Sequence, residues 1–365
     1  MAEHADDPEW RLGLHRSQID AIDEEIQKLL ADRARHAQSI AKIKQESARE
    51  AVFYRPERER QILARVLERH EGPLPEEDVL RIFREIMGSC LALEHKLAVA
   101  YFGSEGSFTE GALRKHFGSA VEALPAPTIA EVFRRVSAEA VDFGVVPVEN
   151  SAEGIVSHTH DLFMQSELVI VGEVVLRVRH QLMSCARNLA DIKQVAAHPQ
   201  ALAQCREWLA SHLPHSALVP VSNNAEAARR AVDDKTLAAI ASREAASRWQ
   251  LEILAADIED APDNTTRFFV IGRKPVGPSG HDKTSLLLSA PHTPGALSAL
   301  LKPLADRGIS LLRIESRPAR WALWEYVFFV DIVGHESEAV VADALEELER
   351  CGRIVRRLGS YPLAL

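Results

Sequence analysis

The sequence has 365 residues, a formal net charge of −10 at pH 7 and four cysteines. This length predicts two or three domains, each able to bury a core. The acidic balance argues against a nucleic acid or a membrane surface as a partner and leaves small anionic substrates open. The cysteines are scattered without a C-x-x-C pair, which predicts neither a zinc site nor a disulfide framework, and no apolar run reaches the ~18 residues of a membrane span. We therefore expect a cytoplasmic protein without a metal.

The first segment, residues 1–95, is expected to form three helices. Leu12–Gln45 contains no Pro, and its apolar residues recur with helical spacing. Two further helices are predicted at Pro56–His70 and Pro75–Lys96, each beginning at a proline. A helix as long as the first extends ~50 Å at 1.5 Å per residue, more than the later two can cover. A partner chain is expected to cover the rest.

Three basic residues of the first helix are candidate anion ligands. Arg33 and Lys44 are eleven residues apart. They therefore fall about 20° from each other on one helix face at 100° per residue. Arg16 lies about 100° away around the helix, so it suits the site of a partner chain better than the same site. The alternative interpretation is a solvated charged face.

The segments His15–Asp23, Leu29–Arg33 and Tyr54–Glu59, together with Lys44, resemble the all-helical chorismate mutases. The resemblance implies an interlocked helical dimer that rearranges chorismate to prephenate. It also implies the roles of individual residues: Arg16 reaches the partner's site, Arg33, Lys44 and Arg58 hold the carboxylates and the ether oxygen, Glu59 binds a hydroxyl, and the third helix contributes Glu94. Such a reaction needs cations in a dry pocket to hold a dianion in a compact chair.

Two positions depart from this resemblance. Cys90 stands where many relatives have Ser, and Glu94 where some have Gln. A carboxylate donates a hydrogen bond to the ether oxygen only when it is protonated. We therefore predict that mutase activity falls with rising pH and that Glu94→Gln flattens this dependence.

The middle segment, residues 96–274, alternates strands, polar turns and helices. Polar turns follow predicted strands at these stretches: Gly103–Thr109, Glu149–Ser151, His198–Gln200 and Ser222–Asn224. A fifth polar turn, Asn264–Thr266, instead leads directly into an apolar strand that ends near Ile271. This alternation predicts a mainly parallel α/β sheet, in two lobes around a cleft that the polar turns face. The spacing matches neither G-x-G-x-x-G nor the P-loop, so we expect no nucleotide cofactor.

Each of these turns also has a structural interpretation. His198 precedes Pro199 and is typical of a turn, and Asn150 with Ser151 is typical of a helix cap. Cys185 and Cys205 are interpreted as small buried residues.

In this order, however, the turns resemble prephenate dehydratases over the whole middle segment, from Gly103–Thr109 to the Thr-Arg-Phe sequence at Thr266. One position departs from the resemblance, because Ser104 stands where relatives commonly have Pro. The resemblance implies conversion of prephenate to phenylpyruvate, with Thr266 as the essential residue. We assign Arg267 to carboxylate binding. The polar groups expected to orient or contact the substrate are Glu149, Asn150, Ser151, Gln200 and Gln204.

The last segment, residues 282–362, follows a Pro- and Gly-rich linker at Arg273–Gly280 and predicts a βαββαβ unit. Two of its stretches, Thr293–Leu297 and Ile314–Pro318, resemble the effector motifs of ACT domains, although Ser298 replaces a residue that is often small and apolar. The resemblance implies that L-phenylalanine binds between paired domains and inhibits the enzyme. The expected effector ligands are Pro294, Gly295, Ala296, Leu297, Glu315, Ser316 and Arg317.

The sequence thus predicts a multidomain α and α/β protein of the bifunctional chorismate mutase/prephenate dehydratase type, assembled as a homodimer or higher homo-oligomer. Two alternatives stay open. One is dehydration of arogenate, which carries an amino group in place of the keto group. The other is an amino-acid-responsive binding protein that retains ligands without turnover. A mutase fused to a prephenate dehydrogenase is disfavoured, since no dinucleotide fingerprint is present.

Overall fold

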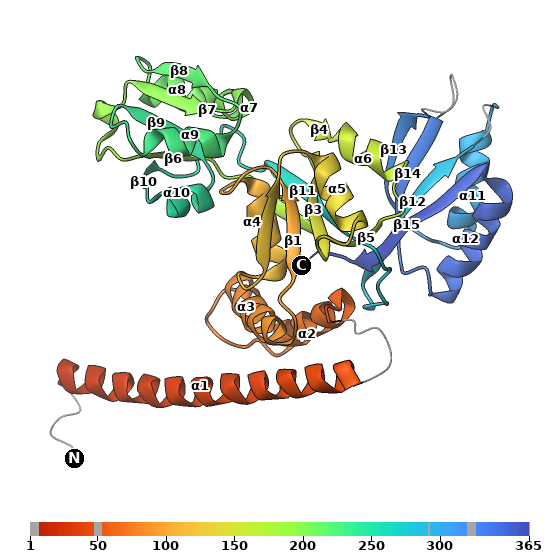
Figure 1. Ribbon diagram of the computed structural model, residues 1–365, viewed down its shortest axis with the longest axis horizontal. Helices are drawn as coiled ribbons and strands as arrows, with labels where there is room; N and C mark the ends of the chain where they lie inside the picture. Colours follow the sequence, from red (N-terminus) through yellow and green to blue (C-terminus); the bar gives the residue numbers. More distant parts are fainter. Residues whose placement is uncertain (1–6, 47–52, 291–292, 320–325, 365) are drawn as a thin grey trace.

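The computed structural model describes residues 7–46, 53–290, 293–319 and 326–364, and Figure 1 shows the arrangement of its elements. Three helices come first: α1 (Pro8–Glu46), α2 (Pro56–Glu68) and α3 (Glu76–Glu94). The third helix ends two residues earlier than the sequence predicts, and an extended stretch leads into the first strand. Helix α1 lies along the helical end of the molecule and buries only Ala37 and Ala41 against the rest of the chain.

The first lobe contains a six-stranded sheet in the order β2 (Glu122–Ala126), β1 (Ala98–Phe102), β3 (Phe143–Asn150), β11 (Thr265–Gly272) and β5 (Val169–Arg177), with β4 (Gly154–Ile155) beside β3. Its helices are α4 (Phe108–Phe117), α5 (Ile129–Ser137) and α6 (Ser157–Phe163). The apolar residues of β1 and β3 are almost completely buried, because helices cover the sheet.

The second lobe contains a five-stranded sheet in the order β10 (Glu252–Ala255), β6 (Gln181–Ser184), β9 (Leu237–Ala241), β7 (Gln194–Ala197) and β8 (Ala217–Pro220). Around it lie η1 (Leu189–Asp191), α7 (Pro199–Gln204), α8 (Arg206–His212), α9 (Asn224–Ala231) and α10 (Arg243–Trp249). The chain enters this lobe after β5 and returns to the first lobe at β11.

The expectation of a mainly parallel sheet is wrong in detail. Strand β1 is parallel to β2 and β3, and β7 is parallel to β8 and β9. Strand β11, however, lies antiparallel between β3 and β5, and β6 lies antiparallel between β9 and β10. The reason is the double crossing between the lobes, since a strand that returns from the other lobe enters the sheet from the opposite end.

The C-terminal domain has the predicted βαββαβ order: β12 (Asp282–Ser289), α11 (Ala296–Asp306), β13 (Leu311–Pro318), β14 (Tyr326–Val333), α12 (Ala339–Cys351) and β15 (Ile354–Pro362). Its sheet order is β13, β14, β12, β15. The sequence predicts the third strand of this unit at Ala322–Val333, and residues 322–325 of that range lie outside the described part of the chain.

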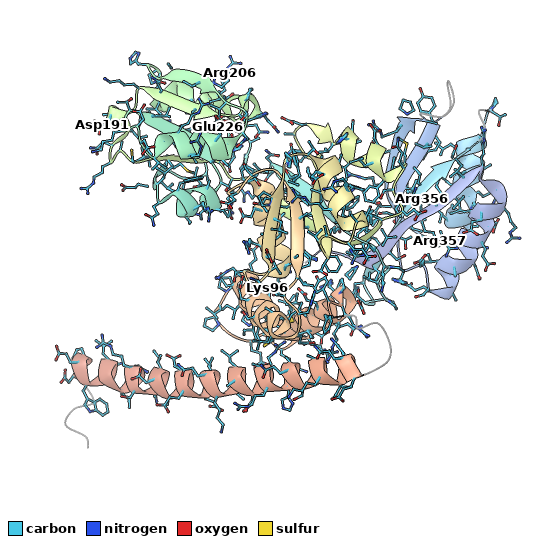
Figure 2. All side chains as sticks on the ribbon, in the orientation of Figure 1. Lys96, Asp191, Arg206, Glu226, Arg356 and Arg357 are labelled. Atoms are coloured by element: carbon cyan, nitrogen blue, oxygen red, sulfur yellow. The ribbon has the colours of Figure 1, made fainter. Side chains whose placement is uncertain are left out.

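The C-terminal sheet lies between its own two helices and the first lobe (Figure 1). Phe269 of β11 packs against Tyr361 of β15, with 6.0 Å between the ring centroids, in one hydrophobic core that both domains share. Successive side chains of β15 face opposite sides of the sheet, as Arg356 and Arg357 show (Figure 2). Arg356 donates a hydrogen bond to the carbonyl oxygen of Ser166 in the first lobe, whereas Arg357 pairs with Glu349 of α12. The two domains are therefore packed as one unit.

Two close approaches fix the domains to one another. A Cβ atom added to Gly359 of β15 would lie 2.2 Å from the carbonyl oxygen of Ile170 in β5. A Cβ atom added to Gly88 of α3 would lie 2.7 Å from the carbonyl oxygen of Phe117 in α4. Each glycine lets two backbones meet where a side chain would keep them apart. Helices α2 and α3 are thus held on the first lobe, while α1 contacts only α3 extensively.

Candidate active sites

A cavity of about 1010 Å³ opens between the two lobes. Polar turns from both lobes line it, as the sequence analysis expected of residues at strand ends. The first lobe contributes Gly103–Thr109, Asn150 and Thr266, and the second lobe contributes His198, Gln200, Gln204 and Ser222–Asn224. The volume suits a small ligand that is bound between convergent polar groups.

Asn150 holds Thr266 in a defined orientation. Its Oδ1 accepts hydrogen bonds from the backbone N–H groups of Ala152 (3.0 Å) and Glu153 (3.2 Å), so its amide nitrogen faces the other way. That nitrogen donates to Asn264 Oδ1 (2.8 Å) and to Thr266 Oγ1 (2.9 Å). Because Thr266 Oγ1 accepts this bond, its own hydroxyl hydrogen remains to be donated into the cavity.

Ser151 supports this arrangement from outside the cavity. Its Oγ accepts a hydrogen bond from the backbone N–H of Thr265 (2.9 Å) and donates to Asn264 Oδ1 (3.4 Å). Ser151 is not among the residues that line the cavity. The direct substrate contact predicted for it is therefore replaced by a role in closing the turn beneath Thr266.

On the opposite wall, His198 is both a helix cap and a cavity residue. Its Nδ1 accepts a hydrogen bond from the backbone N–H of Gln200 (3.3 Å), and its backbone N–H donates to Asn224 Oδ1 (2.8 Å). These bonds join the starts of α7 and α9. The structural and the functional interpretation of this turn are thus compatible.

His180 is a cavity residue that the sequence analysis missed. Its Nε2 donates a hydrogen bond to Gln204 Oε1 (2.8 Å), and burial lowers the pKa of His180, which keeps the ring neutral. His180 follows β5, a strand that the sequence analysis did not identify. A strand assignment at Val169–Arg177 would have placed His180 in another polar turn at a strand end.

Two predicted substrate ligands, Arg267 and Glu149, are turned away from the cavity. Arg267 follows Thr266 on β11, and Glu149 precedes Asn150 on β3. Since successive side chains of a strand point to opposite faces, these two point toward the C-terminal sheet. There the Arg267 Nη1 atom lies 2.7 Å from Asp331 Oδ2, and Glu149 pairs with Arg313. Neither side chain lines the cavity, so this structure gives no support to the substrate contacts predicted for them.

Four predicted mutase residues lie along the contact between α1 and α3. Lys44 Nζ pairs with Glu94 Oε2 at 3.2 Å, and both side chains are largely buried. Arg33 Nη1 donates to the carbonyl oxygen of Ile86 (3.4 Å), and Cys90 is buried on the same helix. Two cations, a carboxylate and a thiol are therefore distributed along this contact.

The other three predicted mutase residues lie apart from this group. Arg16 is exposed on α1, and Arg58 lines a separate groove between α2 and α3. Glu59 is turned toward the first lobe, where burial raises its pKa to about 7 against the opposing effects of Arg84 and Tyr54. The side of α2 that carries Glu59 packs on the first lobe, so this structure does not bring Glu59 together with Lys44 and Glu94.

Helix α1 presents an uncovered apolar face. Its exposed large apolar residues are Trp10, Leu12, Leu14, Ile19, Ile22, Ile26, Leu29, Leu30, Ile40 and Ile43. An exposed apolar surface of this extent is typical of a face that contacts another protein surface.

The two predicted effector motifs lie in the C-terminal domain. Gly295 has φ +81°, a left-handed conformation that favours glycine, and it caps α11. Pro294 and Gly295 are exposed, with Ala296 and Leu297 in the first turn of the helix. Glu315, Ser316 and Arg317 belong to β13, and Arg317 reaches the first lobe, where it donates to Ser157 Oγ (2.7 Å) and Asp161 Oδ1 (2.9 Å).

No helix among the described residues is both long and apolar enough to cross a membrane. Within the same ranges, no group of three or more His, Cys, Asp or Glu side chains is arranged to hold a metal ion.

The chain matches the sequence models of three protein families in succession: chorismate mutase type II at residues 15–95, prephenate dehydratase at 99–276, and ACT domain at 284–350. It is 50% identical over 354 residues to the bifunctional chorismate mutase/prephenate dehydratase of Pseudomonas aeruginosa, which covers 96% of this chain and 97% of that protein.

Two solved structures are similar to the dehydratase and ACT portions. The prephenate dehydratase of Arthrobacter aurescens in complex with L-Phe is 37% identical with a TM-score of 0.68, over 73% of this chain and 90% of that one. A protein titled GqqA, a quorum quenching acylase, is 32% identical with a TM-score of 0.67, over 73% of this chain and 97% of that one. With the full-length identity, these matches show that the chain belongs to the family of bifunctional chorismate mutase/prephenate dehydratases, with a helical mutase domain, a two-lobed dehydratase domain and a C-terminal ACT domain.

Proposed function

We propose that the dehydratase reaction takes place in the cavity between the two lobes, with Thr266 as the hydrogen-bond donor to the leaving hydroxyl. The observation that supports this proposal is the hydrogen bond from Asn150 to Thr266 Oγ1, which leaves the threonine hydroxyl hydrogen for the substrate. Asn150 itself is oriented by two backbone N–H groups, so the donor is held in position before the substrate arrives.

The chemistry requires a proton at the departing oxygen. In prephenate, the bond between the ring and its carboxylate breaks and releases carbon dioxide. The electron pair of that bond completes the aromatic ring as the hydroxyl at the opposite ring carbon departs. A donated hydrogen bond and a proton convert the leaving hydroxide to water, which removes the main obstacle to this step. The products are phenylpyruvate, carbon dioxide and water.

With Arg267 directed elsewhere, other groups are needed for the substrate's two carboxylates. Among the described residues that line the cavity, Arg229 of α9 is the single Arg or Lys. The start of α4 also faces the cavity through Gly103–Thr109, and unpaired backbone N–H groups at a helix start favour an anion. We assign one carboxylate to each.

Thr266→Ala tests this assignment, and Thr265→Ala is its matched control. Thr265 is the neighbouring residue of the same strand and does not line the cavity. We expect Thr266→Ala to lower kcat for phenylpyruvate formation by about 10²–10⁴-fold, the usual range for one acid group, with mutase activity unchanged. Thr265→Ala is expected to keep both activities. Equal loss of both activities in Thr266→Ala would count against separate sites.

For the mutase, we propose a site that two copies of the chain build together. Arg33, Lys44, Glu94 and Cys90 form one part of it where α1 meets α3, and Arg16 of α1 enters the site of the other copy. The uncovered apolar face of α1 supports a homodimer through this helix. Glu94→Gln is expected to flatten the fall of mutase activity with rising pH, and a profile identical to that of the unmodified chain would remove Glu94 from the reaction.

We further propose that L-phenylalanine binds to the paired ACT domains and inhibits the dehydratase. The Arthrobacter aurescens relative, whose ACT portion is similar to this one, was solved with L-Phe. Inhibition requires that the effector bind one conformational state of the dimer more tightly than another. Calorimetric binding of L-phenylalanine together with a dehydratase assay tests both parts, and binding without inhibition would leave sensing alone.

The alternatives make different predictions about turnover. An arogenate dehydratase would turn over arogenate faster than prephenate, and an amino-acid-responsive binding protein would hold a ligand without forming product. The resemblance to a protein titled an acylase adds a reason to measure products directly. All four cysteines are free, which fits the reducing cytoplasm where we place this enzyme.

A further inference from the structure

The two strands that carry Thr266 and Asn150 are also the strands that contact the ACT sheet. Thr266 lies opposite Asn150 in the pairing of β11 with β3, and the next pair along the strands is Arg267 opposite Glu149. The first pair faces the cavity and the second pair faces the ACT domain. The proposed hydrogen-bond donor Thr266 is therefore directly adjacent in sequence to Arg267, which makes the domain contact.

The contact is a network of six charged side chains, of which four are largely buried and two, Arg313 (34% exposed) and Glu149 (21%), lie nearer the surface. Three are cations and three are carboxylates, so the formal charges balance: Arg267, Lys283, Arg313, Glu149, Glu173 and Asp331. Arg267 reaches all three carboxylates, at 2.7 Å from Asp331, 3.6 Å from Glu173 and 3.7 Å from Glu149. Lys283 pairs with Glu173, and Arg313 pairs with Glu149.

Burial makes this network sensitive to the relative position of the two domains. The Asp331 and Glu173 side chains are 8% and 4% exposed. Charged groups this far from water must keep their partners, because an unpaired buried charge is strongly unfavourable. A shift of the ACT sheet relative to the dehydratase sheet cannot leave Arg267 in place, since Asp331 moves with β14.

Strand β13, which carries one of the predicted effector motifs, also contacts the dehydratase domain directly. Arg313 and Arg317 of β13 are four residues apart and therefore lie on the same face of the strand. Arg313 pairs with Glu149 of β3, and Arg317 binds Asp161 of α6 at 2.9 Å (Figure 1 shows α6 beside β13). Strand β13 thus contacts both β3, which ends at Asn150, and α6, the next helix along the chain.

The catalytic strand is irregular at the same point. The register of β11 against β3 shifts between Arg267 and Phe268, so the ladder is interrupted immediately after Arg267. Such irregularities re-aim side chains and allow a strand to bend locally, and they are frequent beside active sites. Strand β11 can therefore adjust at Thr266 while its buried end stays fixed.

We infer that the ion pairs of Arg313 with Glu149 and of Arg267 with Asp331 connect effector binding to the dehydratase site, with Arg313 as a positioning residue. In this account, a movement of β13 and β14 shifts Glu149 and Arg267. Their strand neighbours Asn150 and Thr266 then lose the alignment of the donated hydroxyl. This inference rests on the proposed binding of L-phenylalanine to the ACT domain.

The test compares Arg313→Gln with Arg307→Gln. Arg307 is a matched control because it pairs with Glu347 inside the ACT domain (2.8 Å) and not with the dehydratase domain. The full-length variants are assayed for L-phenylalanine binding by calorimetry and for dehydratase inhibition. In Arg313→Gln we expect binding within about threefold of the original affinity and an inhibitory concentration raised at least about tenfold, the usual scale of a coupling between sites. Arg307→Gln is expected to be inhibited normally.

Arg313→Lys provides the graded variant. It keeps the positive charge but loses the two-pronged contact with a carboxylate, so we expect inhibition intermediate between the original chain and Arg313→Gln. Normal inhibition of a folded Arg313→Gln would overturn the inference. If Arg313→Gln does not fold, normal inhibition of Arg313→Lys would overturn it equally. Failure of the unmodified chain to bind L-phenylalanine would instead refute the proposed effector, so the two failures are distinguishable.

Discussion

The dehydratase cavity and the mutase helix differ in how much of the site one chain supplies. The cavity is lined on both walls by residues of a single chain, and its proposed donor is already oriented by Asn150. Helix α1 contributes a cluster at Lys44 and Glu94 but leaves most of its apolar face uncovered. Crossing strands bring distant turns together within one chain, whereas a long helix exposes more apolar surface than the rest of its own chain covers.

A substitution of Asn150 that no longer orients the Thr266 hydroxyl toward the cavity should have the largest effect on activity. In Asn150→Asp, both oxygens accept hydrogen bonds, so the group facing Thr266 no longer donates. The Thr266 hydroxyl then donates to that carboxylate and not to the substrate. We expect a loss of dehydratase kcat of about 10²–10⁴-fold, with mutase activity retained, in parallel assays of the two reactions. Retained dehydratase activity would show that Asn150 does not orient the donor.

Placing a charge on the uncovered apolar face of α1 should weaken the proposed dimer. Ile26 is 48% exposed in the single chain, so Ile26→Glu leaves the fold of that chain intact. Burying a large aliphatic side chain contributes about 1.5–3 kcal/mol, and a symmetric dimer contains it twice, so the dimer should weaken by at least about 10²-fold. Analytical ultracentrifugation with a mutase assay measures this change.

The control for this variant is Gln27→Glu, which adds the same charge at the next position of the same helix. Position 27 is rotated about 100° from position 26, away from the apolar stripe. We expect this control to keep the dimer and the mutase activity. Equal effects of the two substitutions would contradict an interface through the apolar face.

Gly359→Ala tests whether the dehydratase and ACT domains depend on their close backbone approach. The added Cβ would lie 2.2 Å from Ile170 O. Overpacking of this kind costs about 1–3 kcal/mol, and we expect the free energy of unfolding to fall by about that amount in urea titrations. Gly280→Ala is the control, because Gly280 also has a positive φ, +96°, but open space around it. If both substitutions destabilise the protein equally, the positive φ of the two glycines explains the effect and the close approach to Ile170 does not.

The smallest expected effect concerns Glu59, where the helical unit packs on the first lobe. Burial raises the pKa of Glu59 to about 7, above its ordinary value of 4.5. The folded chain therefore binds this proton more tightly than the unfolded chain. The stabilising contribution is complete below the ordinary value and is lost as the pH rises through about 7.

Glu59→Gln should remove this pH dependence. The change in the free energy of unfolding between about pH 5 and about pH 8 is expected to be smaller in the variant by about 1–3 kcal/mol. Urea titrations of the two proteins at both pH values measure it. If the free energy of unfolding depends on pH in the same way in both proteins, Glu59 is in contact with water and is not buried.

The sequence predicted the cavity better than it predicted individual ligands. Asn150 ends β3, Thr266 lies at the start of β11, and Gln204 ends α7, the helix that follows β7. Residues near strand ends converge whatever the detailed sheet order. Arg267 and Glu149 do not line the cavity, because each is adjacent to a cavity residue and adjacent residues of a strand face opposite sides. His180 was missed with its strand.

The helical unit shows a different limit. Periodicity predicted α1, since helical spacing is a local feature. The partner chain expected on its apolar face stays a prediction. The burial of Glu59 depends on which face of α2 packs on the first lobe, and that choice is made by contacts between domains, such as those of Gly88 and Phe117. No pattern within the helix records it.

The most direct test of shared and single-chain sites is complementation between inactive variants. Arg16→Ala and Lys44→Ala are refolded together, and so are Thr266→Ala and Asn150→Asp. If Arg16 serves the partner's site, half of the mixed dimers are heterodimers with one intact mutase site of two, so about a quarter of the original mutase activity should return. The dehydratase mixture should stay inactive. Mutase activity that fails to return, or dehydratase activity that does return, would contradict the account.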